Sequence, residues 1–68
     1  MDESEHLISM ANQIAANFRF HDDCVERIAD HIRRFWAPSM RQMLLERVDS
    51  QAPKLDAAVV EAVRELRD

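Results

Sequence analysis

Apolar residues recur along the chain at intervals of three and four residues, the spacing of one face of an α-helix. The first stretch carries Leu7, Met10, Ala11, Ile14, Ala15 and Phe18. Later stretches carry Val25, Ile28, Ala29 and Ile32, then Met40, Met43, Leu44 and Val48, and finally Val59, Val60, Val63 and Leu66. The pattern predicts an all-α fold, a small bundle of three to four short helices over about 4–19, 23–36, 38–48 and 56–67.

Helix-breaking and helix-capping residues predict where these helices begin and end. Pro38 holds the residue before it in extended geometry and suits a first helical turn, so the second helix should end near Trp36. Residues 49–53 form a loop in this interpretation.

Acceptor side chains are expected to cap the N-termini of three helices. Ser4 or Asp2 can cap the first helix, and Asp56 is the expected N-cap of the fourth. Asp23 followed by Glu26 resembles a capping box at the start of the second helix.

Composition narrows the architecture to a single helical domain over residues 1–68. Glycine is absent and the only asparagines, Asn12 and Asn17, lie inside a helical stretch, so tight β-turns lack their usual residues. A chain this short buries only about 60% of its unfolded surface. Cys24 is the only cysteine and cannot form an intramolecular disulfide. Extra stability is therefore expected from a partner or from very good helix packing.

Charge and hydropathy point away from membranes and nucleic acid. Acidic residues occupy the N-terminus where a signal peptide would need positive charge, and no stretch approaches the ~20 apolar residues that span a bilayer. The net charge of -4 is unfavourable for binding phosphates. We expect a cytoplasmic location, which suits the single thiol, with no membrane and no nucleic-acid partner.

The side-chain inventory predicts no catalytic, cofactor-binding or metal site. The chain has no glycine-rich phosphate loop and no HExxH motif. The potential metal ligands lack the paired spacing of a zinc site; they are His6, His21, Cys24 and His31. Acidic neighbours oppose a thiolate at Cys24, so a small, partly buried residue is expected there.

The first helix has an unusual second face. The stretch Leu7–Phe18 contains no charged residue, and small or amide side chains lie opposite its apolar stripe. Charged residues are depleted at interface cores, so Asn12 and Gln13 are candidate partner contacts. The alternative is a weakly polar face exposed to solvent.

A basic and aromatic block follows in the second and third helices. No acidic residue occurs between His31 and Leu45, although the chain as a whole is acidic. Asp30 can pair with Arg34, whereas Arg41 has no acidic residue at helical spacing. Arginine beside tryptophan and methionine is typical of binding hot spots. The block supplies the remaining candidate interface residues: Arg33, Arg34, Phe35, Trp36, Pro38, Met40 and Arg41.

The two adjacent aromatic residues cannot both face one core, because neighbours on a helix point about 100° apart. In one interpretation Phe35 and Trp36 cover the end of the bundle while the arginines reach into water. In the other, they belong to a binding hot spot for a partner, and both interpretations can hold together, with Phe35 inward and Trp36 shared. We favour a partner contact.

These residues also carry a family resemblance. Met10-Ala11-Asn12-Gln13-Ile14, and then His31-Ile32-Arg33-Arg34-Phe35-Trp36 with Pro38, Met40 and Arg41, resemble the delta subunit of NAD-dependent formate dehydrogenase. The resemblance covers essentially the whole chain. The family often has a second arginine directly after the proline, where this chain has Ser39.

The resemblance implies a non-catalytic accessory subunit that docks on the large catalytic (alpha) subunit, beside beta and gamma subunits, and supports assembly and stability. Such complexes oxidise formate to carbon dioxide at bis-molybdopterin guanine dinucleotide with molybdenum or tungsten. Iron–sulfur clusters and FMN then pass electrons to NAD. None of these groups is expected on this chain, because one cysteine cannot ligate a cluster. The alternatives are a transient assembly factor for molybdenum-cofactor loading and a small helical DNA-binding regulator.

Overall fold

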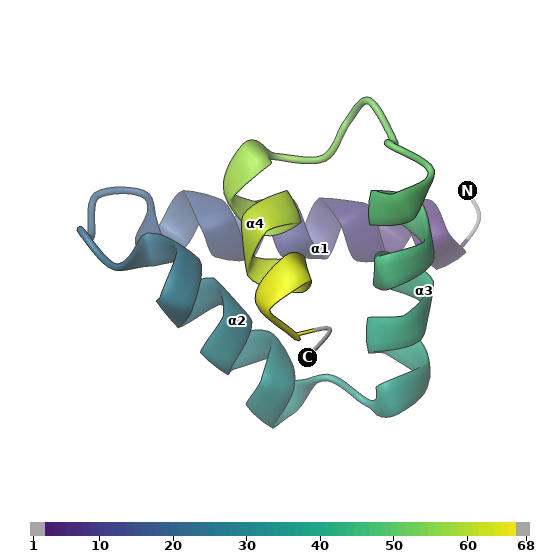
Figure 1. Cartoon of the computed structure of the whole chain (residues 1–68), viewed down its shortest axis with the longest axis horizontal. Coiled ribbons are helices and arrows are strands. Elements are labelled where there is room, and N and C mark those ends of the chain that lie inside the picture. Colours follow the sequence, from purple (N-terminus) through teal and green to yellow (C-terminus); the bar gives the residue numbers. More distant parts are fainter. Residues whose placement is uncertain (1–2, 67–68) are drawn as a thin grey trace.

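The computed structural model describes residues 3–66, which form four helices (Figure 1). They are α1 (Glu3–Phe18), α2 (Cys24–Phe35), α3 (Pro38–Asp49) and α4 (Ala57–Leu66). No strand occurs within this part of the chain. The all-α prediction is confirmed, and each helix boundary within residues 3–66 lies one residue or less from its predicted position.

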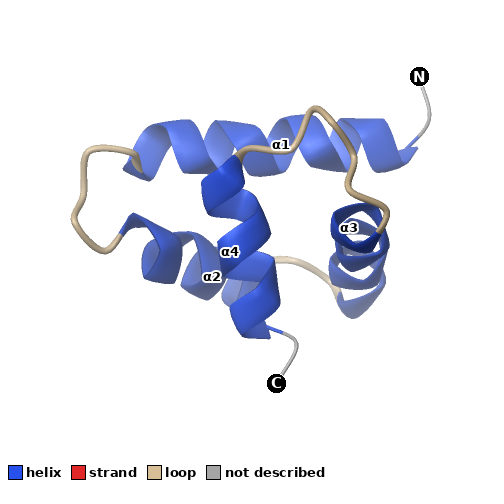
Figure 2. Ribbon diagram, turned by 45° about the horizontal axis from the view of Figure 1, so that its top comes forward, coloured by secondary structure: helices blue, strands red, loops and turns tan. Residues whose placement is uncertain are grey.

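The helices cross one another rather than lying parallel. α1 runs along the back of the molecule and α4 crosses in front of it, between α2 and α3 (Figure 1). The most extensive helix–helix contact is between α2 and α4. Turning the molecule shows the loop after α3 passing along α1 before it enters α4 (Figure 2). α4 therefore lies between α2 and α3, and α1 packs against all three of these helices.

The apolar stripes meet in one core. The buried residues of the cluster are Leu7, Ala11, Ala15, Ile28, Ala29, Ile32, Trp36, Leu44, Val48, Val59, Ala62 and Val63. Ala11 and Ala62 have no exposed surface, and side chains this small let helix backbones approach closely. Ile28 and Ile32 of α2 are fully buried as well. Burying such side chains contributes about 1.5–3 kcal/mol each, so the core accounts for most of the fold's stability.

Two of the predicted caps have different outcomes. The Asp56 cap is confirmed, because the Ala58 amide donates to Asp56 Oδ1 over 2.9 Å. The capping box at Asp23 is wrong. Asp23 occupies the N-cap position without a side-chain cap bond. Its carboxylate instead accepts a hydrogen bond from Arg27 Nε over 2.7 Å, and this bond lowers the pKa of Asp23.

The proposed cap of α1 at Ser4 is also wrong, because Ser4 lies inside the helix and is buried. Its Oγ accepts hydrogen bonds from the guanidinium of Arg47, the Nε bond being 2.9 Å. This contact ties the start of α1 to the end of α3. The alternative cap, Asp2, lies outside the described residues.

The end of α3 carries a strained backbone position. Gln51 has φ of 57°, in the left-handed region that favours glycine. The amides of Gln51 and Ala52 donate to the carbonyls of Val48 and Arg47, over 3.0 and 3.1 Å. This hydrogen-bond pattern is the Schellman motif that closes a helix C-terminus. It turns the chain away from α3 and into the loop that lies along α1.

Candidate partner interface

The junction of α2 and α3 brings most of the predicted interface residues together. α2 ends at Phe35, and extended backbone at Trp36 and Ala37 reverses the chain before Pro38 starts α3. The Arg41 guanidinium then reaches back and donates from Nη1 to the carbonyl oxygen of Arg33 over 3.1 Å. The last turn of α2 and the first turn of α3 therefore form one surface, which we call the α2–α3 corner.

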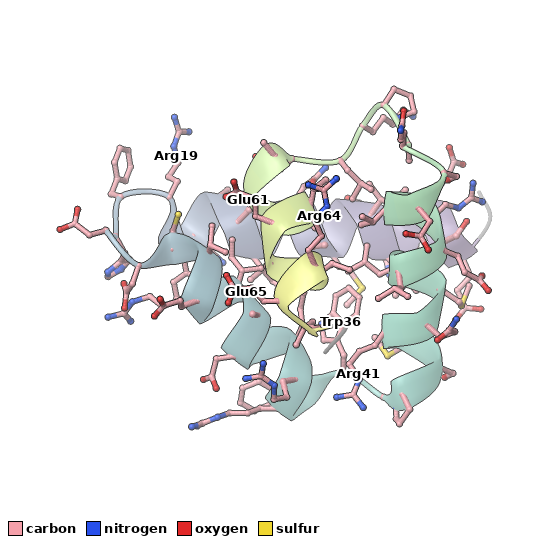
Figure 3. The ribbon with its side chains drawn as sticks, viewed as in Figure 1. Arg19, Trp36, Arg41, Glu61, Arg64 and Glu65 are labelled. Atoms are coloured by element: carbon pink, nitrogen blue, oxygen red, sulfur yellow. The ribbon has the colours of Figure 1, made fainter. Side chains whose placement is uncertain are left out.

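The two aromatic residues at this corner differ sharply in burial. Trp36 is 6% exposed and belongs to the core, whereas Phe35 is 72% exposed. Figure 3 shows Trp36 beneath the C-terminal end of α4, between α2 and α3. The expectation that Phe35 packs inward and Trp36 is shared is therefore wrong. Trp36 continues the row of Ile28 and Ile32 at steps of four residues, and this row faces α4.

Phe35 is the outer end of a row of rings that the sequence did not indicate. Its ring lies 4.9 Å from that of His31, which lies 6.5 Å from Phe18. Phe18 in turn lies 6.0 Å from His21. The i,i+4 spacing of His31 and Phe35 could have revealed the first contact, and Phe18 and His21 are only three residues apart, but the contact of Phe18 with His31 joins α1 to α2. The His31 ring therefore contacts one side of Phe35, while most of the Phe35 side chain remains exposed.

The charge pattern at the corner is partly as predicted. Arg34 Nε lies 3.2 Å from Asp30 Oδ2, which confirms the predicted i,i+4 pair. Arg33 and Arg41 form no ion pair with any other residue in the range 3–66. The first turn of α3 contains no acidic residue, so the positive end of its helix dipole adds to their charge. The corner is a basic surface on an acidic chain.

A groove of about 490 Å³ opens at this corner. We call it the α2–α3 groove, and its lining residues are Ile32, Arg33, Pro38, Arg41, Gln42, Leu44, Leu45, Val63 and Leu66. Ile32, Leu44 and Val63 are buried and form its floor, whereas Arg33 is exposed and Arg41 half-buried at its edge. Three predicted interface residues thus share one concave site: Arg33, Pro38 and Arg41.

The other predicted contacts of this block surround the groove without lining it. Arg34 and Phe35 are exposed at the end of α2. Met40 is half-buried and packs against the core. Trp36 supports the corner from inside. No observation of the structure tests whether these residues contact a partner, so that role remains a prediction.

Asn12 and Gln13 lie apart from the groove. They line a second hollow, of about 630 Å³, between α1 and the loop that follows α3. The Asn12 side chain is engaged within the chain: Nδ2 donates to the Lys54 carbonyl over 2.8 Å and Oδ1 accepts from the Asp56 amide over 3.0 Å. Asn12 therefore holds the loop on α1, a role that no spacing along the sequence indicated. A partner contact of Gln13 stays a prediction.

A family model for the NADH-dependent formate dehydrogenase delta subunit, FdsD, matches residues 6–63. The chain belongs to this family. The match confirms the resemblance. Its span includes the α2–α3 corner and the lining residues of both hollows, except Glu5 and Leu66. Neither the curated proteins nor the solved structures contain a significant match.

As a delta subunit, the chain is one component of a formate dehydrogenase complex and has the other subunits as partners. Within residues 3–66 no group of three or more His, Cys, Asp or Glu side chains is arranged to hold a metal ion. None of the helices in that range is long and apolar enough to cross a membrane.

Proposed function

We propose that this delta subunit is a non-catalytic accessory subunit of a cytoplasmic NAD-dependent formate dehydrogenase. It docks on the large catalytic subunit through the α2–α3 corner and supports the assembly and stability of the complex. The observation that carries this proposal is the corner itself, where the last turn of α2 exposes 72% of Phe35 and the adjoining groove is lined by Arg33 and Arg41.

The energetics favour covering this corner. A large apolar side chain gains about 1.5–3 kcal/mol when it moves from water into an apolar contact. Aromatic residues and arginine dominate the hot spots of protein interfaces. The chain exposes Phe35 at the point where two arginines have no acidic partner within residues 3–66, so a complementary partner surface would satisfy both groups.

The chemistry of the complex is assigned to the other subunits in this proposal. Formate oxidation at bis-molybdopterin guanine dinucleotide, and electron transfer through iron–sulfur clusters and FMN to NAD, require ligands in numbers that this chain lacks. Cys24 is its only cysteine, while a cluster typically needs four. The delta subunit would act by holding the cofactor-bearing subunits in a stable arrangement.

Purification of the complex from cells with and without the delta subunit tests this function. With a tag on the large subunit, we expect the delta subunit to be retained in a fixed stoichiometry. Without it, we expect the complex to dissociate at lower dilution in size-exclusion chromatography, with lower formate-dependent NAD reduction. An intact complex of full activity that never retains the delta subunit would contradict the proposal. If only traces of the delta subunit are retained, and the complex from cells without it has a low molybdenum content, the delta subunit would instead be a transient factor for cofactor loading.

A further inference from the structure

The α2–α3 groove combines an apolar floor with two guanidinium groups at its edge. Ile32, Leu44 and Val63 are each at most 2% exposed and close the groove from below. Arg33 comes from α2 and Arg41 from α3, and both line the groove at its edge. A concave apolar site with a few convergent polar groups is the usual form of a binding pocket.

Most hydrogen-bond donors of these two arginines are available to a ligand. A guanidinium carries five N–H donors, and Arg41 uses one of them on the Arg33 carbonyl. That bond also orients the Arg41 guanidinium toward the end of α2. No hydrogen bond or ion pair within residues 3–66 engages the Arg33 side chain. Two guanidinium groups at one edge can hold a carboxylate with paired, charge-assisted hydrogen bonds.

Charge complementarity identifies the chemistry of the occupant. The neighbouring arginines already have carboxylate partners, Arg27 with Asp23 over 2.7 Å and Arg34 with Asp30 over 3.2 Å. Arg33 and Arg41 have none among residues 3–66, although the chain has a net charge of -4. A small inorganic anion would leave the accessible apolar lining, Pro38, Leu45 and Leu66, uncovered. A peptide segment with an acidic and an apolar side chain would satisfy both parts of the groove.

We propose that the α2–α3 groove binds a short segment of a partner subunit that presents an aspartate or glutamate carboxylate beside an apolar side chain. The carboxylate contacts Arg33 and Arg41, and the apolar side chain covers the half-buried Leu45 and Leu66, which also line the groove. This inference rests on the proposed docking function and names the chemistry of the partner at that site.

Zero-length carbodiimide cross-linking tests the inference directly, because it joins an amine to a carboxylate in contact with it. Lys54 is the only lysine of the chain, so an introduced lysine gives a new and easily assigned cross-link. The variants are Arg33→Lys and Arg41→Lys, each mixed with the complex of the other subunits at a concentration that saturates binding. Arg19→Lys and Arg64→Lys are matched controls outside the groove. Figure 3 shows Arg19 near the α1–α2 loop, at the other end of the molecule from Arg41.

The inference predicts a cross-link from residue 33 or 41 to an aspartate or glutamate of another subunit, identified by mass spectrometry, and none from the two controls. The charge reversals Arg33→Glu and Arg41→Glu should lower the affinity about tenfold or more. Lysine variants that stay bound without this cross-link would overturn the inference and leave the docking proposal intact. A cross-link to a second copy of this chain would overturn it too. Failure of the unsubstituted chain to bind the complex would instead contradict the proposed function.

Discussion

The guanidinium of Arg41 donates a hydrogen bond to the carbonyl oxygen of Arg33, eight residues earlier in the chain, over 3.1 Å. The bond crosses the extended turn at Trp36 and Ala37 and holds the first turn of α3 against the last turn of α2. It also places the two arginines at one edge of the α2–α3 groove. The same contact therefore shapes the fold locally and prepares the surface that we propose for docking.

Removing this contact should have a small effect on the isolated chain. Arg41→Ala is expected to lower the free energy of unfolding by about 0.5–1.5 kcal/mol, because one hydrogen bond at an exposed site is lost. Urea denaturation followed by circular dichroism measures this change. Arg64→Ala, at an exposed position of α4 with no such bond, is the matched control and should change stability less. Equal effects of the two substitutions would show that the Arg41 bond does not form in solution.

Substitutions of Trp36 and Phe35 should have very different effects on the free energy of unfolding. Trp36→Ala should cost about 3–5 kcal/mol, because it removes the largest side chain of the core at the end of α4. Phe35→Ala should change the free energy of unfolding by about 0.5 kcal/mol or less, since Phe35 is 72% exposed. Thermal melting of the isolated variants decides this. A larger loss for Phe35→Ala than for Trp36→Ala would reverse the assignment of the two side chains.

The left-handed residue after α3 offers a stabilising substitution. Gln51→Gly should raise the free energy of unfolding by about 1 kcal/mol, because glycine adopts φ of 57° without a Cβ clash. Ser50→Gly is the control one residue earlier, where φ is -82° and the Ser50 hydroxyl donates to the Arg47 carbonyl. That control should be destabilising. Denaturant titration of both variants measures whether each substitution raises or lowers the free energy of unfolding. A loss of stability in Gln51→Gly would contradict the Schellman geometry.

The loop after α3 should depend on one amide side chain of α1. Asn12→Ala removes both bonds that hold Lys54 and Asp56, so the loop should leave α1 more often. Limited trypsin digestion reports this opening, because cleavage after Lys54 requires a free loop. We expect faster cleavage after Lys54 in Asn12→Ala and an unchanged rate in Asn17→Ala, an exposed asparagine of the same helix. Equal rates in both variants would mean that the Asn12 bonds do not restrain the loop.

The helices were predictable because their signals are local. The three- and four-residue spacing places apolar side chains on one face whatever the rest of the chain does. The Asp30–Arg34 pair was predictable for the same reason, since both residues lie on one helix. The Asp56 cap also depends only on its immediate neighbours.

The structural features that were predicted wrongly or not at all depend on contacts between distant segments of the chain. Phe35 and Trp36 lie three and four residues after Ile32, and both spacings fit the α2 stripe. Only the position of α4 decides that Trp36 is the buried one. The Asn12 bonds span 42 and 44 residues. The groove likewise needs α2, α3 and α4 together, so the sequence indicated its arginines but not that they line one groove.

The affinity of the purified formate dehydrogenase complex for added delta subunit tests docking through the α2–α3 corner most directly. The test chain combines Phe35→Ala with Arg33→Glu, and the control chain carries Arg19→Glu together with the exposed substitution Asn17→Ala. Both chains should melt within a few degrees of the unsubstituted subunit. Our account predicts that the test chain binds at least about thirtyfold more weakly, the scale of a lost hot spot, while the control binds normally. Equal affinity of a folded test chain and the unsubstituted subunit would contradict docking through this corner.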